Sequence, residues 1–322
     1  FLYAGIPLAF WPNVILQAAL MVWLLLLTMR AQGLGGRPWL ALAIVTMLCV
    51  GTGLPWFAGL LMPDILFPAA VLALSLLAFQ ANQLSRWESF GLAVLIALAI
   101  PSHMAAAGLC AGVIVALWVL SRLPRLGMPK PRVTVAAVAV ATGILLCPVS
   151  NYAITGQFAF TPGGTGFLFG RLVDDGIIER YLDERCPDPA LRLCAFKDEL
   201  PDEVDDWLWG HDSPLYKLGG WEGHRSEQQA IIRDTLRRYP LTHAIAAATA
   251  TFDQFTTFGT EFSIEDNDPA IETFANYLPQ LYPQLMSARQ QAQKFDIAPL
   301  NFIHVPVSGL AMAGLFGALL FR

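Results

Sequence analysis

Long uncharged apolar runs recur through the first half of the chain and return once at its end. Seven of them predict membrane-spanning helices, near residues 12–33, 38–58, 63–82, 87–101, 104–122, 133–153 and 302–321. The fourth run is short and is separated from the fifth by Pro101, Ser102 and His103. This pair predicts either a tight helical hairpin or a broken re-entrant element. We favour the hairpin because it keeps the charge pattern consistent.

The Lys and Arg residues outside the long segment between the sixth and seventh runs predict the orientation. If each run crosses the membrane, all eight fall on one side: Arg30, Arg37, Arg86, Arg122, Arg125, Lys130, Arg132 and Arg322. The opposite side has residues 1–11, the turn near Leu60 and the turn at Ser102, with no Lys or Arg. Because basic residues collect in cytoplasmic loops, the basic side is predicted to be cytoplasmic.

Residues 154–300 then form one non-cytoplasmic domain, between a transmembrane core of residues 1–153 and a final span in 301–322. The domain holds 12 basic and 23 acidic residues, a net charge of −11 that argues against nucleic acid as a partner. We expect helices near 196–208, 226–238, 241–258 and 270–294, with Ser226 and Gln229 as a capping box. The glycine-rich stretch Thr161–Gly170 predicts a loop.

Composition supports the same class of protein. Hydrophobic residues make up 55% of the 322 positions and charged residues 14%, which is outside the range of ordinary soluble chains. We therefore expect an all-α polytopic membrane protein of about seven spans, with a mainly α-helical domain inserted before the last span. The chain opens at Phe1 and stops at Arg322, with neither an initiating Met nor a signal-peptide layout, so we expect a fragment.

The five cysteines divide between the two regions. Cys49, Cys110 and Cys147 lie inside predicted spans, whereas Cys186 and Cys194 lie eight positions apart in the exported domain. An oxidising compartment favours a structural disulfide between the latter two. The alternatives are two free buried thiols or a metal site, and the nearby His residues lack ligand spacing.

Three side chains near the predicted outer boundary are candidates for a site. Asp64 is the only acidic residue in or beside a span on that side, and a carboxylate at membrane depth is a functional candidate unless it only stabilises the first turn of its helix. His103 could bind a phosphate or shuttle a proton, or lie at the interface without a role. Trp56 fits an aromatic belt or stacking on a sugar ring.

The exit from the sixth run carries a resemblance to a known family. The run ends in Asn151-Tyr152, followed by Gly156 and the stretch Thr161-Pro162-Gly163-Gly164. This arrangement, with Pro63-Asp64 opening a span, resembles the polytopic C-type glycosyltransferases, which include protein mannosyltransferase-like and aminoarabinose transferase-like enzymes. The resemblance covers roughly residues 5–170 and identifies no individual family.

The resemblance implies sugar transfer from a polyprenyl-phosphate donor to a glycan, lipid or protein acceptor at the periplasmic face of a bacterial inner membrane. It implies a main catalytic acid upstream of Phe1, with Asp64 as a supporting acid. Asn151, Tyr152 and Trp56 are candidate substrate-binding residues, and His103 and Arg171 are candidates to steady the departing phosphate. Arg171 is alternatively a surface partner of Asp174 or Asp175. No cofactor is certain, and a divalent metal stays open.

Two other functions compete with this hypothesis. A non-catalytic subunit would use the exported domain to bind glycan, for which Trp207, Trp209 and Trp221 are candidates, although core packing is their alternative role. A solute transporter is disfavoured because the spans contain almost no polar pathway residues and show no repeated half. No Gly-x-Ser-x-Gly elbow, P-loop or His-Glu-x-x-His helix occurs in the sequence, so hydrolase, nucleotide-driven pump and metalloprotease functions have no support.

Overall fold

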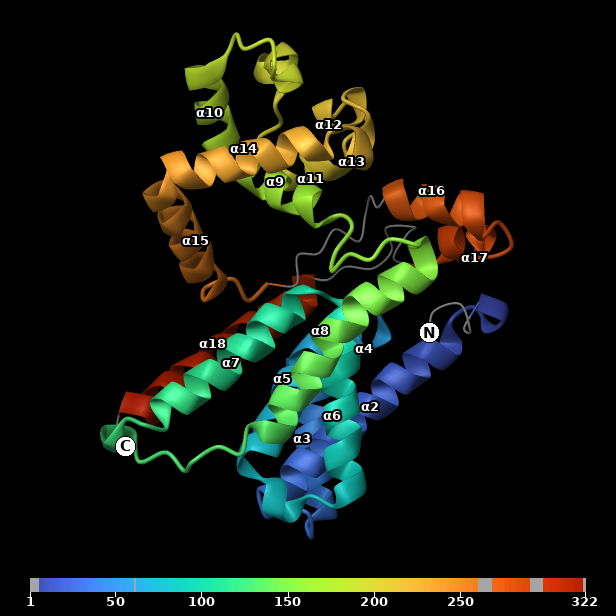
Figure 1. Ribbon diagram of the computed structural model, residues 1–322. Helices are drawn as coiled ribbons and strands as arrows, with labels where there is room; N and C mark the ends of the chain where they lie inside the picture. Colours follow the sequence, from blue (N-terminus) through green and yellow to red (C-terminus); the bar gives the residue numbers. More distant parts are fainter. Residues whose placement is uncertain (1–5, 61, 260–267, 290–297, 321–322) are drawn as a thin grey trace. The chain divides into compact units, whose positions relative to one another are not determined.

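The computed structural model describes residues 6–60, 62–259, 268–289 and 298–320, which form helices and connecting turns with no strand among them (Figure 1). The chain divides into two compact units, here called the membrane unit (Phe1–Phe160 with Phe258–Arg322) and the acidic unit (Thr161–Thr257). The acidic unit is narrower than the expected domain of residues 154–300, because the helices after residue 258 group with the membrane unit.

The membrane unit contains ten α-helices and four 3₁₀ turns among its described residues. They are η1 (Ile6–Leu8), α2 (Trp11–Ala31), α3 (Pro38–Gly51), α4 (Leu54–Gly59), η2 (Pro63–Ile65), α5 (Leu66–Phe79), η3 (Ala81–Gln83), α6 (Arg86–Ser102), α7 (Ala105–Leu120), η4 (Pro124–Leu126), α8 (Thr134–Thr155), α16 (Asp268–Tyr277), α17 (Tyr282–Ser287) and α18 (Ala298–Leu320).

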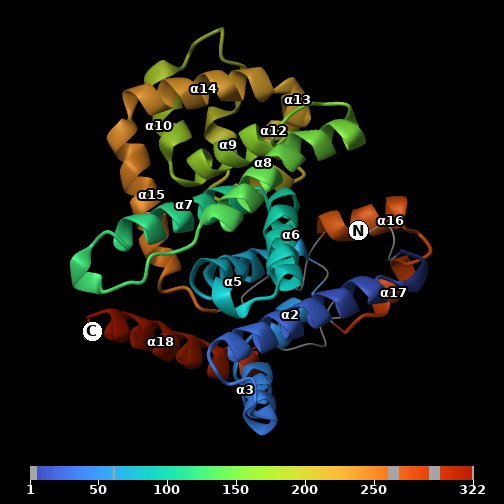
Figure 2. The same ribbon diagram turned by 60° about the horizontal axis from the view of Figure 1, so that its bottom comes forward.

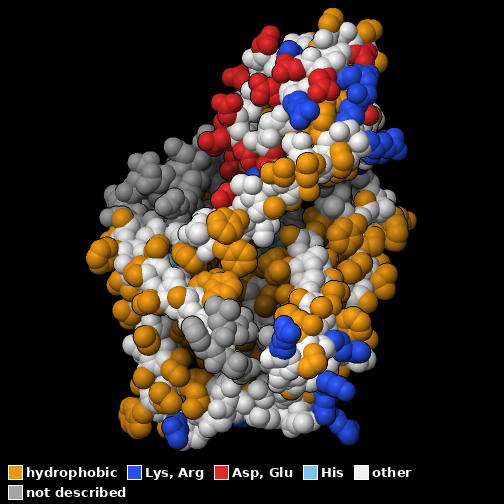
Figure 3. All heavy atoms as spheres, turned by 90° about the vertical axis from the view of Figure 1, so that its left-hand side faces the viewer, with side chains coloured by type: hydrophobic (Ala, Val, Ile, Leu, Met, Phe, Trp, Pro, Cys, Tyr) orange, Lys and Arg blue, Asp and Glu red, His pale blue; other side chains and the backbone are white. Residues whose placement is uncertain are grey.

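Three of the described helices are long and apolar enough to cross a membrane, and they indicate a membrane protein. They are Trp11–Ala31, Thr134–Thr155 and Ala298–Ala318. Shorter apolar helices cover Pro38–Gly51, Leu66–Phe79 and Ala105–Leu120. Figure 3 shows hydrophobic side chains over much of the visible face of the membrane unit and Lys and Arg at one end of it. The count of seven spans stays a prediction.

The expected span at 38–58 is not one continuous helix. It breaks at Thr52, whose backbone is extended, and α4 starts after Gly53. Pro55 lies in the first turn of α4, where its missing N–H costs no hydrogen bond. The Gly53 N–H donates to His304 Nδ1 of α18 over 3.1 Å. A side chain 251 positions away therefore satisfies a backbone donor at the break.

Helices α5, α6 and α8 pack together in the core of the membrane unit (Figures 1 and 2). Gly143 of α8 permits the close approach, because a Cβ there would lie 2.9 Å from the Ala97 carbonyl oxygen and 2.8 Å from Ile100 Cδ1. Small residues at such contacts let helix backbones approach within a membrane. The apolar sequence of these runs predicts helices, whereas the close approach of α6 and α8 depends on the absence of a side chain at Gly143.

The start of α6 is determined by a signal that our sequence analysis overlooked. Ser85 Oγ accepts from the Glu88 N–H, and Glu88 Oε2 accepts from the Ser85 N–H, which completes a capping box. Glu88 also accepts from both terminal nitrogens of Arg30 at 2.8 and 2.7 Å. This ion pair joins the end of α2 to the start of α6.

The acidic unit is a cluster of short helices around its own apolar core. Its elements are α9 (Gly164–Asp174), α10 (Ile177–Arg185), η5 (Arg192–Glu199), α11 (Val204–Trp209), α12 (Pro214–Lys217), α13 (Gly220–Gly223), α14 (Arg225–Arg238) and α15 (Pro240–Gln254). Phe169, Ile178, Trp207 and Ile231 are among the buried residues that form the core. The expected helices near 226–238 and 241–258 are confirmed as α14 and α15.

The prediction of a loop over Thr161–Gly170 was wrong from Gly164 onward, where α9 begins. Its glycines are packing residues, since a Cβ at Gly166 would lie 2.6 Å from Trp221 Cζ3 and a Cβ at Gly170 would lie 2.9 Å from Trp207 Cδ1. Glycine is poor for an isolated helix, yet close tertiary contact outweighs that preference here.

Two further helix predictions were wrong. The helix expected over 196–208 is interrupted, because η5 ends before the extended Leu200 that precedes Pro201 and α11 starts only at Val204. The helix expected over 270–294 divides into α16 and α17, while residues 290–294 lie outside the described residues.

The capping box predicted at Ser226 and Gln229 is absent. Helix α14 already begins at Arg225 after His224, which places Ser226 inside the helix. The Gln229 amide instead donates to Thr165 Oγ1 of α9 over 3.3 Å. Gln229 thus contacts a residue 64 positions away and does not form the predicted local capping box.

Candidate functional site

Asp64 and His103, 39 positions apart in sequence, meet in the membrane unit. His103 Nε2 lies 3.3 Å from Asp64 Oδ1. The side chain of His103 is 44% exposed and that of Asp64 is 42% exposed, so a ligand can reach both. A carboxylate and an imidazole in contact form a unit that can hold and orient a proton.

The segment before Asp64 is held by a polar residue of α2. Gln17 is buried, and its side-chain amide donates to the Leu60 carbonyl over 2.9 Å and more weakly to the Ala58 carbonyl over 3.4 Å. Asp64 itself lies in η2, directly before α5. Sequence analysis missed Gln17, although an amide inside an otherwise apolar span was a usable signal.

His103 is positioned by the junction of α6 and α7. Its N–H donates to the Ala99 carbonyl over 3.0 Å, and its carbonyl accepts from the Ala106 N–H over 2.8 Å. The Phe67 ring contacts the imidazole edge-on, with centroids 5.6 Å apart. Phe67 follows Asp64 by three positions, so η2 and the first turn of α5 supply these two neighbours of His103.

The other candidates from the membrane unit differ in their exposure and contacts. Trp56 is half-buried in α4. The Asn151 amide donates to the Ala159 carbonyl over 2.7 Å and to the Phe160 carbonyl over 3.1 Å, so it fastens the chain that leaves α8. Tyr152 is exposed. Substrate binding by these three residues stays a prediction.

Arg171 belongs to the acidic unit and forms local ion pairs. Its guanidinium lies 2.7 Å from Asp174 Oδ2 and 2.7 Å from Asp175 Oδ1, one helical turn along α9. These contacts match the alternative of a surface partner for the two aspartates. A role of Arg171 in phosphate binding stays a prediction.

The three tryptophans of the acidic unit occupy two different environments. Trp207 is fully buried, with its ring 5.1 Å from that of Phe169. Trp209 and Trp221 instead form an aromatic cluster with Phe167, whose ring centroids lie 5.4–6.2 Å apart. Phe167 and Trp209 are 48% and 44% exposed, which leaves ring surface available for a ligand.

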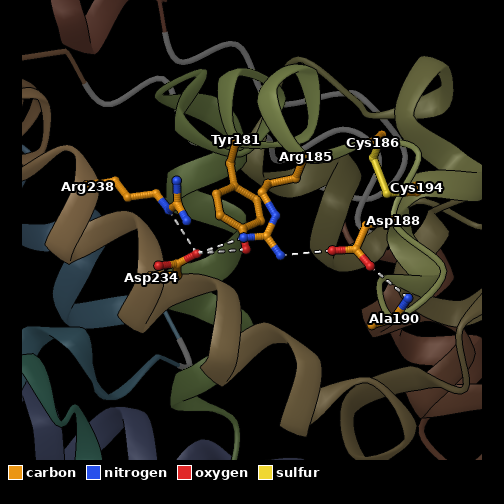
Figure 4. Close-up of polar contacts among 8 residues, drawn as sticks. All are labelled: Tyr181, Arg185, Cys186, Asp188, Ala190, Cys194, Asp234 and Arg238. Atoms are coloured by element: carbon orange, nitrogen blue, oxygen red, sulfur yellow. Dashed lines mark hydrogen bonds and ion pairs between the residues drawn. A yellow bond between two sulfur atoms is a disulfide. The ribbon is translucent and has the colours of Figure 1, made fainter.

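The predicted disulfide between Cys186 and Cys194 is confirmed, and a polar network continues from the loop that it closes (Figure 4). Asp188 within that loop accepts from Arg185 over 2.8 Å. The hydrogen bond from Arg185 lowers the pKa of the Asp188 carboxyl.

Asp234 of α14 accepts from Tyr181 over 3.1 Å and from Arg238 over 3.0 Å. Burial works in the opposite direction at Asp234, yet the hydrogen bonds from Arg238 and Tyr181 leave its pKa below the usual value.

His224 is buried in the core of the acidic unit, against Phe169 and Trp207. Burial lowers the pKa of its imidazole, and the Glu227 carboxylate, 3.5 Å from His224 Nε2, offsets only part of that effect. The folded state therefore holds His224 neutral at a pH where the unfolded chain would protonate it.

We expect the stability of the acidic unit to fall as the pH drops below about 6.5, because the unfolded state then binds the additional proton. His224→Phe should reduce the slope of the unfolding free energy against pH by up to about 1.4 kcal/mol per pH unit in this range. Urea denaturation of the full-length protein in nanodiscs at several pH values, followed by hydrogen exchange of α14 corrected for intrinsic rates, measures it. His211→Phe, at an exposed position, is the control. Unchanged pH dependence in His224→Phe would contradict the prediction.

Among the described residues, no group of three or more His, Cys, Asp or Glu side chains is placed to hold a metal ion. No protein-family model, curated protein or solved structure matches this chain. The functional hypothesis therefore depends on the chemistry and placement of the described side chains.

Proposed function

We propose that this protein is a membrane glycosyltransferase that moves a sugar from a polyprenyl-phosphate donor to an acceptor at the non-cytoplasmic face. The observation that carries the proposal is the accessible Asp64–His103 pair at the start of an apolar helix. An ionisable pair beside lipid-facing helices is costly to keep and points to a function. The membrane would be a bacterial inner membrane, with the acidic unit in the periplasm.

The position of the pair along α5 agrees with the predicted orientation. Asp64 precedes the first residue of α5, whereas Arg132 donates its backbone N–H to the Ala78 carbonyl at the other end. Fourteen residues of helix, about 21 Å by the rise per residue, separate these ends. This separation of the pair from Arg132 and the basic loops supports a reaction on the non-cytoplasmic side.

In the proposed reaction, the acceptor hydroxyl attacks the anomeric carbon as the bond to the donor phosphate breaks. The bonding electrons leave with the polyprenyl phosphate, and a carboxylate accepts the hydroxyl proton. Asp64 orients His103 through Nε2, and a protonated His103 then offers Nδ1–H to a departing phosphate oxygen. Donors fixed where negative charge develops are an effective form of catalysis.

A second candidate function is a non-catalytic subunit that binds glycan through the acidic unit. The aromatic cluster of Phe167, Trp209 and Trp221 favours it, since exposed rings can stack on sugar faces. The same cluster is also compatible with acceptor binding by an enzyme.

The test is transfer of radiolabelled sugar from a panel of polyprenyl-phosphate donors by the full-length protein in lipid. We expect transfer with at least one donor, and its loss when both Asp64 and His103 are replaced. Absence of transfer with every donor, combined with glycan binding that Trp209→Ala and Trp221→Ala abolish, would replace the enzyme with the binding subunit.

A further inference from the structure

A cavity of about 510 Å³ lies in the membrane unit where the end of α5, η3, the start of α6 and the start of α8 meet. Its lining residues are Leu77, Ala81, Ser89, Pro131, Arg132, Val133, Thr134 and Val135. The volume falls within the roughly 300–1,000 Å³ of small-molecule sites. It lies at the opposite end of α5 from Asp64, so it is separate from the proposed transfer site.

The cavity combines apolar walls with one cationic side chain. Leu77, Val133 and Val135 supply hydrocarbon, while Arg132, Ser89 and Thr134 supply donors. Arg132 Nη1 donates to Asn82 Oδ1 over 2.6 Å, and within the described part of the chain no acidic side chain forms an ion pair with it. A guanidinium has five donor hydrogens, so most of its capacity is available to an acceptor.

The surrounding charge is also positive. Arg86 precedes Ser89 on the first turn of α6, and Arg122, Arg125 and Lys130 lie in the loop that leads to Arg132. Glu88, the one acidic residue in this part of the sequence, is occupied by Arg30 and by the Ser85 N–H. Charge complementarity therefore favours an anion, and the apolar walls favour one attached to hydrocarbon.

We propose that this cavity binds the phosphate group of an anionic membrane phospholipid, with Arg132 as its principal contact. A phosphate ester matches the planar donors of arginine. The glycerol and first acyl carbons would lie against Leu77, Val133 and Val135. Basic pockets between membrane helices on the cytoplasmic side are a recognised mode of anionic-lipid binding.

The experiment places the full-length protein in nanodiscs of phosphatidylcholine with or without phosphatidylglycerol and counts retained lipids by native mass spectrometry across a titration. Arg132→Gln should weaken retention of one phosphatidylglycerol by tenfold or more, as expected for a charge-assisted hydrogen bond. Arg125→Gln removes the same charge from the same loop outside the cavity, and long-range attraction limits its effect to about fivefold. Equal losses in the two variants would overturn the proposal.

Two further arms complete the test. Ser89→Leu adds apolar bulk to the cavity wall and removes one of its donors while leaving Arg132 and Asn82 unchanged in sequence, and it should lower retention. Retention unaffected by Ser89→Leu would show that the cavity is not the site. Inorganic phosphate, added while phosphatidylglycerol is titrated into phosphatidylcholine nanodiscs, should not displace phosphatidylglycerol from the cavity. Full displacement at equal concentration would assign the site to free phosphate.

Discussion

Trp207→Ala is expected to destabilise the acidic unit by about 3–5 kcal/mol, the usual cost of removing a buried aromatic side chain. Trp207 is fully buried and packs on Phe169. Gly170 lies so close that a Cβ there would come within 2.9 Å of the indole. Loss of the indole leaves a cavity that the surrounding residues close only in part. Urea unfolding of the full-length protein in nanodiscs, followed by hydrogen exchange of α9 and α14, measures the change.

Trp209→Ala is the matched control for this variant. Trp209 lies two positions further along the same short helix, but 44% of its surface is exposed. Its replacement should cost about 1 kcal/mol or less, in the range of exposed substitutions and single aromatic pairs. Equal destabilisation by the two variants would contradict the assigned burial.

Asp64→Asn is expected to lower sugar transfer about 100-fold, within the range for a lost acid–base or orienting group. His103→Gln should cause a similar loss, because Asp64 acts through the imidazole that it contacts at 3.3 Å. If the two residues act as one unit, the double variant should be no slower than the more impaired single variant. Initial rates with a fixed donor and varied acceptor, for all four proteins, give the coupling.

Arg171→Gln provides a control for this cycle. Its ion pairs with Asp174 and Asp175 lie at the exposed surface of α9, so transfer should stay close to that of wild type. Purely additive losses for Asp64→Asn and His103→Gln would instead show that the two side chains act independently.

Properties that depend on neighbouring residues could be predicted from the sequence. Apolar runs near 12–33, 133–153 and 302–321 correspond to helices long enough to cross a membrane, because hydrocarbon forces backbone hydrogen bonds within each segment. The disulfide followed from two cysteines eight positions apart in a segment predicted to be exported. The Ser85–Glu88 capping box was equally local and was overlooked.

Properties that depend on residues far apart in the chain were decided only by the tertiary structure. The sequence predicted Asp64 and His103 on one side of the membrane, but only the packing of η2 and α5 near the α6–α7 junction brings the two side chains together. Nothing local distinguishes Trp207 from Trp209, and the helix formed by the glycine-rich stretch from Gly164 determines which one is buried. Hydropathy and capping act over a few residues, whereas burial and side-chain pairing depend on which helices pack together. Small residues such as Gly143 determine how closely those helices approach.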